Sequence, residues 1–175
     1  MKLIRTLARF LVLAGIAVGI VMIMGKNKNS FTSEGYIGQS DIVIENGHMT
    51  PEALLAFGRL SDPQMSPDGE YILYGVSYTS TVDNRSCRNL FICRKDGSDR
   101  QQITKSGKSL SNARWINGGN QIAFLSGGSM WVMNADGTNR KQVPGIEGMD
   151  AFEFSPAGDK IMYISYIKAC TRPTD

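Results

Sequence analysis

Short apolar runs separated by turn residues recur along the chain after residue 58. They lie at 71–78, 89–94, 121–126, 129–134 and 160–165. The runs are rich in β-branched and aromatic residues, which favour strands. Turns such as KDGSD, SGGS and ADGTN stand between them, and their Asp-Gly and Gly-Gly pairs supply the positive φ that tight hairpins need. Because no helical pattern separates the runs, we expect an all-β fold.

The strand pattern repeats with a spacing of about 40 residues. RKDGSDRQQI at 94–103 returns as NADGTNRKQV at 134–143, and RWINGGNQIAFLS at 114–126 returns as EFSPAGDKIMYIS at 153–165. Each unit reads as an inner strand, a turn, two strands joined by a hairpin, and a short outer strand after an Asp-Gly turn. Four strands in about 40 residues is the size of one β-propeller blade.

The repeats occupy about 62–104, 112–143 and 150–175, which predicts an incomplete β-propeller of about two and a half four-stranded blades over 59–175. The first repeat carries extra residues, TSTVDNRSCR at 79–88, which we expect to form a loop between its second and third strands. Propellers close with typically 4–8 blades. An open blade face of about 500 Å² would forfeit about 12 kcal/mol of apolar burial, comparable with the stability of a whole domain. We therefore expect a longer chain or a partner to cover these faces.

The first 28 residues have a different character. Lys2, Arg5 and Arg9 precede sixteen uncharged residues at 10–25. This pattern predicts a cleaved export signal or an uncleaved membrane anchor, with a buried helix as the third interpretation. Either of the first two would place the rest of the chain outside the cytoplasm, in the periplasm or anchored facing it.

A polar linker at 29–48 and a short helix at 49–58 precede the strands. Thr50 suits the N-cap, and Pro51 suits the first helical position, where its missing N–H is not needed. We expect the helix to cover 51–57 and Gly58 to adopt the left-handed conformation that often follows a helix.

Charge and cysteine content exclude several classes. Five of the 19 Lys and Arg lie in the first 28 residues, which leaves 14 bases against 16 acids and no basic nucleic-acid surface. The odd set Cys87, Cys93 and Cys170, with a single His, indicates neither a disulfide framework nor a zinc site. Cys93 is expected to be a small buried apolar residue, with a Cys87–Cys93 disulfide as the less favoured alternative.

The segment RLSDPQMSPDG, after a leader and a short TPEAL helix, resembles the start of the propeller in the prolyl oligopeptidase family of serine peptidases. The resemblance covers 49 to about 168 and is greatest to the bacterial dipeptidyl-peptidase and acylaminoacyl-peptidase-like branch. The DGxxRxQIT and WINGGNQIAFLS units also resemble the WD40-like repeats of TolB-type periplasmic proteins.

The family resemblance implies an exported serine exopeptidase whose propeller gates and positions peptides for a hydrolase domain absent from this sequence. The implied partners are the remaining blades and the hydrolase domain of a longer chain, or a protein that covers the open blade faces. No nucleic acid is implied, and a membrane only through the leader. The alternatives are a TolB-like propeller that binds proteins and a truncated product without function.

No catalytic, cofactor or metal-binding residue is assigned from the sequence. A G-x-S-x-G nucleophile motif fails because Trp131 stands where the last Gly should follow Gly127 and Ser129, which instead fit a hairpin turn. His48 is the single histidine and lies in the linker, so no Ser-His-Asp triad can form and the chain alone should be inactive.

Four other features have simpler structural explanations. Gly107-Lys108-Ser109 lacks the rest of a phosphate loop and is expected in a loop between blades. The triplet at Asn84 matches a glycosylation acceptor, a pattern that is common by chance. Three aspartates are assigned to turns and not to a calcium site, namely Asp68, Asp96 and Asp136. Trp115 and Trp131 are assigned to the core between blades and not to a ligand-stacking surface.

Overall fold

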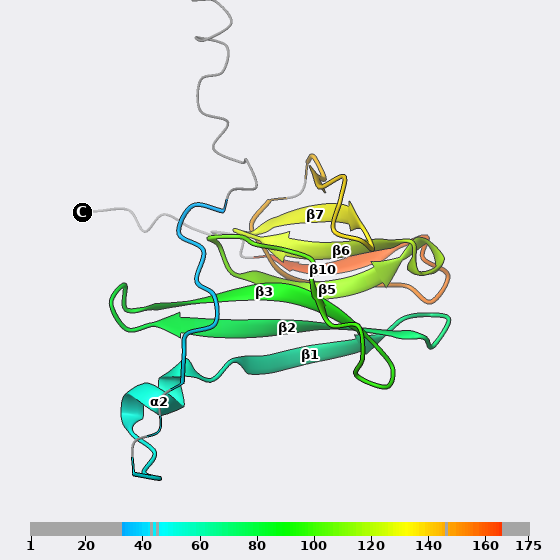
Figure 1. The fold of residues 1–175 in the computed structure, drawn as a ribbon. Coiled ribbons are helices and arrows are strands. Elements are labelled where there is room, and N and C mark those ends of the chain that lie inside the picture. The colour runs from blue at the N-terminus through cyan, green and yellow to red at the C-terminus, as the bar shows by residue number, and fades with distance from the viewer. Residues whose placement is uncertain (1–32, 43, 45, 146, 166–175) are drawn as a thin grey trace, which may run out of the picture. The chain divides into compact units, whose positions relative to one another are not determined.

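Three antiparallel sheets follow one another along the chain in the computed structural model, which describes residues 33–42, 44, 46–145 and 147–165 (Figure 1). All of them belong to one unit, Phe31–Asp175. The predicted leader at 1–28 and Cys170 lie outside the described residues. Within the described ranges no helix is long and apolar enough to cross a membrane.

Blade 1 and blade 2 are four-stranded sheets in which neighbouring strands are consecutive in sequence. Blade 1 contains β1 (Arg59–Met65), β2 (Tyr71–Ser80), β3 (Arg85–Arg94) and β4 (Gln101–Gln102). Blade 2 contains β5 (Leu110–Ile116), β6 (Gln121–Ser126), β7 (Ser129–Asn134) and β8 (Lys141–Gln142), with the 3-10 turn η1 (Asn117–Gly119) between β5 and β6. Blade 3 is the pair β9 (Met149–Phe154) and β10 (Ile161–Ser165). The prediction of an incomplete all-β propeller is confirmed.

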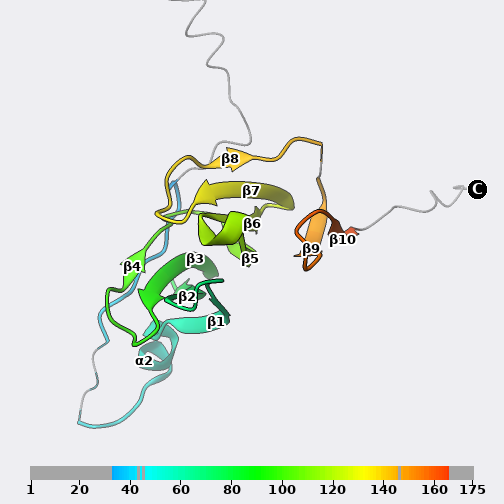
Figure 2. The same ribbon diagram turned by 90° about the vertical axis from the view of Figure 1, so that its right-hand side faces the viewer.

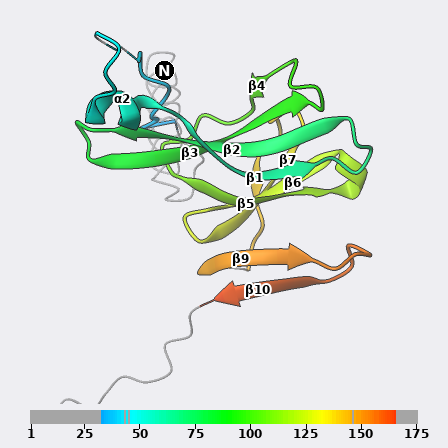
Figure 3. The same ribbon diagram turned by 90° about the horizontal axis from the view of Figure 1, so that it is seen from below.

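The first strands of the three blades lie next to one another. Strand β5 contacts β1 on one side and β9 on the other. Figure 2 shows β4 and β8 at the edges of their sheets away from β1 and β5, and Figure 3 shows β9 between β5 and β10. We therefore call β1, β5 and β9 the inner strands.

The hairpin of blade 2 forms as the SGGS sequence predicts. Gly127 and Gly128 have φ of 59° and 75°, and Ser126 pairs with Ser129 across the turn. Positive φ at both central residues is the requirement of a tight hairpin turn, which glycine meets without strain.

The extra residues of blade 1 do not form the expected loop. They lengthen β2 and β3, whose pairing continues to Ser80 and Arg85. Thr79 and Ser86 hydroxyls lie 2.8 Å apart across the strands, and the Ser80 hydroxyl donates to Asp83 at 2.9 Å in the turn. The prediction of a loop was wrong because β-branched and hydroxyl residues in this segment pair across the hairpin.

Two apolar clusters join the blades. The first lies between blades 1 and 2, and the second between blades 2 and 3. The first cluster contains Leu73, Leu90, Ile103, Leu110, Ala113, Ile122, Phe124, Trp131 and Met133, with Ile92 and Trp115 packed against it. The second contains Ala123, Leu125, Met130, Met149 and Phe152. Trp115 and Trp131 therefore belong to the core between blades, as predicted.

The short helix α2 (Pro51–Ala56) begins as predicted and ends differently. Thr50 Oγ1 accepts a hydrogen bond from Ala53 N at 3.2 Å. The chain leaves the helix through an extended Phe57, and Gly58 does not adopt a positive φ. A Cβ at Gly58 would lie 2.7 Å from the Tyr78 ring and 2.8 Å from Val76, so close packing on β2 explains this glycine, not a left-handed cap.

Residues 33–42, which we call the strap, pack on blade 1 instead of forming a free linker. Ile37 is buried, and the Tyr36 hydroxyl exchanges hydrogen bonds with Gln102. Arg85 donates to Gly35 O. A Cβ at Gly107 would overlap Glu34 O, so glycine is needed where the strap crosses the loop between β4 and β5. Gly107-Lys108-Ser109 thus lies in a loop between blades, as predicted.

The described cysteines do not form a bridge. Cys87 and Cys93 are both buried and free. They lie on one strand six residues apart, a separation of about 20 Å that no disulfide spans. Cys93 packs with Tyr74 and Val76, which confirms its role as a small apolar residue. Cys87 Sγ donates to Ser106 O at 3.1 Å, and burial raises the pKa of its thiol.

Candidate functional site

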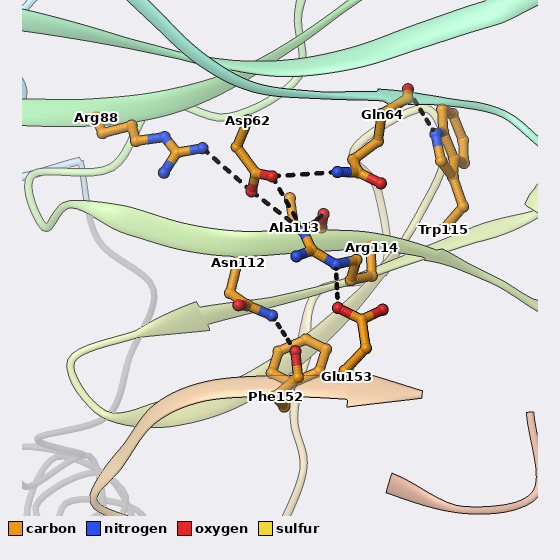
Figure 4. A network of polar contacts seen from close by, with 9 residues as sticks. All are labelled: Asp62, Gln64, Arg88, Asn112, Ala113, Arg114, Trp115, Phe152 and Glu153. Carbon is orange, nitrogen blue, oxygen red and sulfur yellow. Dashed lines mark hydrogen bonds and ion pairs between the residues drawn. The ribbon is translucent and has the colours of Figure 1, made fainter. Parts of the chain in front are cut away.

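Charged side chains from all three blades meet along the inner strands (Figure 4). Asp62 lies on β1, Arg114 on β5 and Glu153 on β9. Arg88 reaches the same group from β3. We call these four residues the inner-strand network.

The inner strands place these residues through local irregularities in the sheet. The pairing of β1 with β2 shifts between Ser61 and Gln64, and that of β5 with β6 shifts between Ser111 and Arg114. Asp62 and Asn112 stand at the two shifts, with φ of 51° and 52°. Asp and Asn tolerate positive φ better than other residues with a side chain. Such bulges bend the strand and re-aim its side chains.

Arg114 bridges blades 1 and 3. Its Nη1 lies 3.2 and 3.1 Å from the two Asp62 carboxylate oxygens, and its Nε donates to Glu153 Oε2 at 2.9 Å. Burial disfavours the charge of Arg114, but the hydrogen bond and charge of Glu153 and the charge of Asp62 outweigh it and raise the pKa of the guanidinium. Arg114 therefore stays charged and ties three strands from three blades.

Arg88 extends the inner-strand network across blade 1. Its Nη2 lies 3.5 Å from Asp62 Oδ2, an ion-pair distance too long for a strong hydrogen bond. Within the described part of the chain, the buried Nε and Nη2 have no hydrogen-bond partner. A Cβ at Gly75 would overlap Arg88 Nε, so a glycine at this position lets the guanidinium cross the sheet.

Neutral hydrogen bonds join the same strands. Trp115 Nε1 donates to Gln64 O at 3.2 Å, which connects blades 1 and 2. Asn112 Nδ2 donates to Phe152 O at 2.6 Å, which connects blades 2 and 3. The inner strands thus carry polar links in addition to the apolar clusters, and they present both positive and negative groups.

The residues considered for catalysis, glycosylation or metal binding do not come together as a site. Ser129 pairs with Ser126 at the start of β7, as expected for a hairpin. His48 is exposed in the segment before α2. Asn84 lies in the β2–β3 turn with a φ of 48°. No group of three metal-ligating side chains occurs among the described residues.

The three turn aspartates form hydrogen bonds within their own turns, as predicted. Each carboxylate accepts a main-chain N–H and a hydroxyl from nearby residues. Asp136, for example, accepts Thr138 N at 2.9 Å and Thr138 Oγ1 at 2.7 Å. The side-chain hydrogen bond is the largest cause that lowers the pKa of each carboxyl. The donors are Ser66 for Asp68, Ser98 for Asp96 and Thr138 for Asp136.

The inner-strand network was not predicted from the sequence, although one signal was present. The self-alignment places Arg114 over Glu153, so opposite charges occupy equivalent positions on neighbouring inner strands. In a propeller, equivalent positions of successive inner strands lie side by side. The roles of Asp62 and Arg88 carry no comparable signal, because they depend on a bulge and on a glycine across the sheet.

Two curated relatives match most of the chain. A protein named Dipeptidyl-peptidase 5 from Porphyromonas endodontalis is 34% identical over 129 residues, 71% of this chain and 19% of the relative. Its namesake from Porphyromonas gingivalis is 38% identical over 162 residues, 87% of this chain and 24% of the relative. The chain therefore spans about a quarter of these relatives or less. No family model matches.

Solved structures show the same fold. An acylaminoacyl peptidase in complex with Z-Gly-Gly-Phe-chloromethyl ketone has a TM-score of 0.55 at 17% identity, covering 69% of this chain and 19% of that one. The AtxE2 isopeptidase in its apo form has a TM-score of 0.53 at 16% identity, covering 66% and 23%. With the sequence relatives and the blade architecture, these matches give one conclusion. The chain is a propeller portion of the prolyl oligopeptidase family.

Proposed function

We propose that the chain contributes to the gating propeller of an exported serine exopeptidase of the dipeptidyl-peptidase type. In this role the propeller admits and positions peptides for a hydrolase domain that lies elsewhere in a longer chain. The observation that carries the proposal is the 34% and 38% identity to two proteins named Dipeptidyl-peptidase 5 over most of the chain.

The inner-strand network supports this role. Asp62, Arg88, Arg114 and Glu153 place both charges on the side where the three blades meet. A short peptide carries an amine and a carboxylate, and a surface with both charges complements such a substrate. Glu153 is the most accessible member, with 54% of its side chain exposed, and we propose that it contacts peptides that enter.

The test uses the protein at its native length. A peptide series of increasing size, with release of dipeptides as the readout, should show turnover that falls with size and is abolished by a serine-directed fluorophosphonate. Glu153→Gln should change the KM for charged peptides, whereas the matched change Glu70→Gln, at a partly exposed glutamate paired with Lys95, should not.

Three outcomes count against the proposal. A native-length protein without a fluorophosphonate-reactive serine would favour the alternative, a TolB-like propeller that binds proteins. Equal KM changes in the Glu153 and Glu70 variants would remove the contact assigned to Glu153. Export is tested separately by cell fractionation, and recovery of the protein in the cytoplasm would contradict it.

A further inference from the structure

Two arginines share the carboxylate of Asp62, and they hold it unequally (Figure 4). Arg114 Nη1 lies 3.2 and 3.1 Å from its two oxygens, whereas Arg88 Nη2 lies 3.5 Å from Oδ2. Charge-assisted hydrogen bonds between nitrogen and oxygen are usually about 2.7–2.9 Å long. In the structure Asp62 is therefore bound by Arg114 and lies outside the distance of a strong hydrogen bond from Arg88.

Arg88 presents an unused pair of donors beside this carboxylate. Of the buried side-chain nitrogen and oxygen atoms in the described ranges, only Arg88 Nε and Nη2 lack a hydrogen-bond partner. These two atoms form one edge of the guanidinium, and such an edge matches the two oxygens of a carboxylate. Buried donors without an acceptor are costly. An approach of about 0.7 Å by Asp62 would give Nη2 a charge-assisted hydrogen bond.

Arg114 has a second edge that Asp62 occupies only in part. Nη1 and Nη2 form the end of the guanidinium, and Nη1 contacts Asp62 and the Ala113 carbonyl. No described residue forms a hydrogen bond with Nη2, and this atom, unlike the two Arg88 nitrogens, is not buried. The inner strands of a propeller surround its central channel. A carboxylate in that channel can therefore bind both terminal nitrogens of Arg114 only when Asp62 leaves Nη1.

We propose that Arg114 binds the carboxylate of a peptide ligand and that Asp62 then pairs with Arg88. The ligand takes both terminal nitrogens of Arg114, and the displaced Asp62 carboxylate takes the Nε–Nη2 edge of Arg88. Arg88 is a positioning residue, since it acts on the ligand only through Asp62. The inference rests on the proposed function in taking a peptide as the ligand, and it names the carboxylate as the group that is recognised.

The exchange also explains why a carboxylate should be preferred to an amide. In the structure two arginines face two carboxylates, so the formal charges of the inner-strand network sum to zero. A ligand carboxylate at Arg114 adds a negative charge that Asp62 repels, and movement of Asp62 toward Arg88 lowers this repulsion. An amide carries no charge and has only one acceptor oxygen, so it cannot replace Asp62 on Arg114.

Binding of N-acetyldiglycine and of its amide to the native-length protein measures this preference. The probes differ only at the carboxylate, and neither has a free amine that would engage Glu153. We expect the carboxylate to bind at least about tenfold more tightly, and Arg114→Met to remove the preference. Arg88→Met should reduce it at least about threefold. The matched change Arg94→Met, at another 3.5 Å ion pair with an aspartate, should leave it unchanged. Equal binding of both probes would overturn the proposal.

The Asp62→Asn variant separates the exchange from a purely structural role of Arg88. Without a carboxylate at position 62, Arg114 Nη1 is available to the ligand, so N-acetyldiglycine should bind about tenfold more tightly than to the unmodified protein. Arg88→Met should then have no further effect on binding, because Arg88 acts through the Asp62 carboxylate. Weaker binding by Asp62→Asn, or an equal effect of Arg88→Met in both backgrounds, would overturn the proposal.

A crystal structure of the unmodified native-length protein with N-acetyldiglycine tests the exchange without a substitution. The distance between Asp62 and Arg88 Nη2 should shorten from 3.5 Å to about 2.8 Å. An unchanged distance with the probe on Arg114 would overturn the exchange. None of these measurements requires turnover. A protein that binds the probe in this way but releases no dipeptides contradicts the proposed function alone, and a peptidase that binds both probes equally contradicts this inference alone.

Discussion

Replacing Phe124 with alanine tests whether blades 1 and 2 share one core. Phe124 has no exposed surface and lies in the cluster that joins the blades. Phe→Ala changes in cores cost about 3–5 kcal/mol, depending on how far the site can collapse. Strand β6 is held by pairing with β5 and β7, so collapse is restricted and we expect about 4 kcal/mol.

Urea unfolding followed by tryptophan fluorescence measures this cost, because Trp115 and Trp131 both contact the cluster. With a slope of about 2 kcal/mol/M, the midpoint should fall by about 2 M. Val82→Ala, at a residue that is 94% exposed, should shift it by about 0.3 M or less. Should Phe124→Ala be unfolded without urea, Phe124→Leu should lower the midpoint by less than about 0.8 M. A Phe124→Ala midpoint within about 0.5 M of the unmodified protein, or separate transitions for the two blades, would refute the shared core.

Three further predictions concern the polar contacts. In a double-mutant cycle of Asp62→Asn and Arg114→Met, urea unfolding should give a coupling free energy of about 1 kcal/mol between the two side chains. Additive effects on the free energy of unfolding would contradict a stabilising contact between Asp62 and Arg114. Because the pKa of Asp136 is lowered in the folded state, its ionised carboxylate stabilises the protein above the unfolded-state pKa near 4, and this contribution is lost as pH falls through the folded-state pKa. The Asp136→Asn variant should therefore lose less stability than the unmodified protein between pH 6 and pH 3, and equal losses would contradict this. Gly107→Ala should displace the strap and accelerate labelling of the buried Cys87 by at least about tenfold, whereas an unchanged rate would show that the strap does not protect it.

Much of the fold is readable from local sequence because its turns carry strong signals. Gly127 and Gly128 fix one hairpin by their positive φ, and the Asp-Gly turn at Asp136 is held by hydrogen bonds within three residues. The apolar positions of the strands follow from the repeat, which is why Trp115 on β5 and Trp131 on β7 are correctly assigned to the core. These features depend on contacts that are close in sequence or repeated along it.

The missed features depend on contacts between distant residues. The strap is polar and without periodicity, yet Ile37 is buried and Tyr36 exchanges hydrogen bonds with Gln102, which is 66 residues away in sequence. A glycine directly after a helix usually forms a left-handed cap, but Gly58 is required because Val76 and Tyr78 on β2 leave no space for a Cβ. Asp62 contacts Arg88 and Arg114 because a bulge bends β1, and no local sequence pattern predicts that bulge.

The size of the native polypeptide tests the central claim most directly. Mass spectrometry of the native protein, separated by size, would follow peptides from Gln121–Arg140. We predict that these peptides occur in a chain several times longer than 175 residues that also carries a reactive serine, in keeping with relatives of which this chain matches 19% and 24%. Recovery of the peptides only in a chain of about 175 residues or shorter would contradict the assignment to a peptidase propeller.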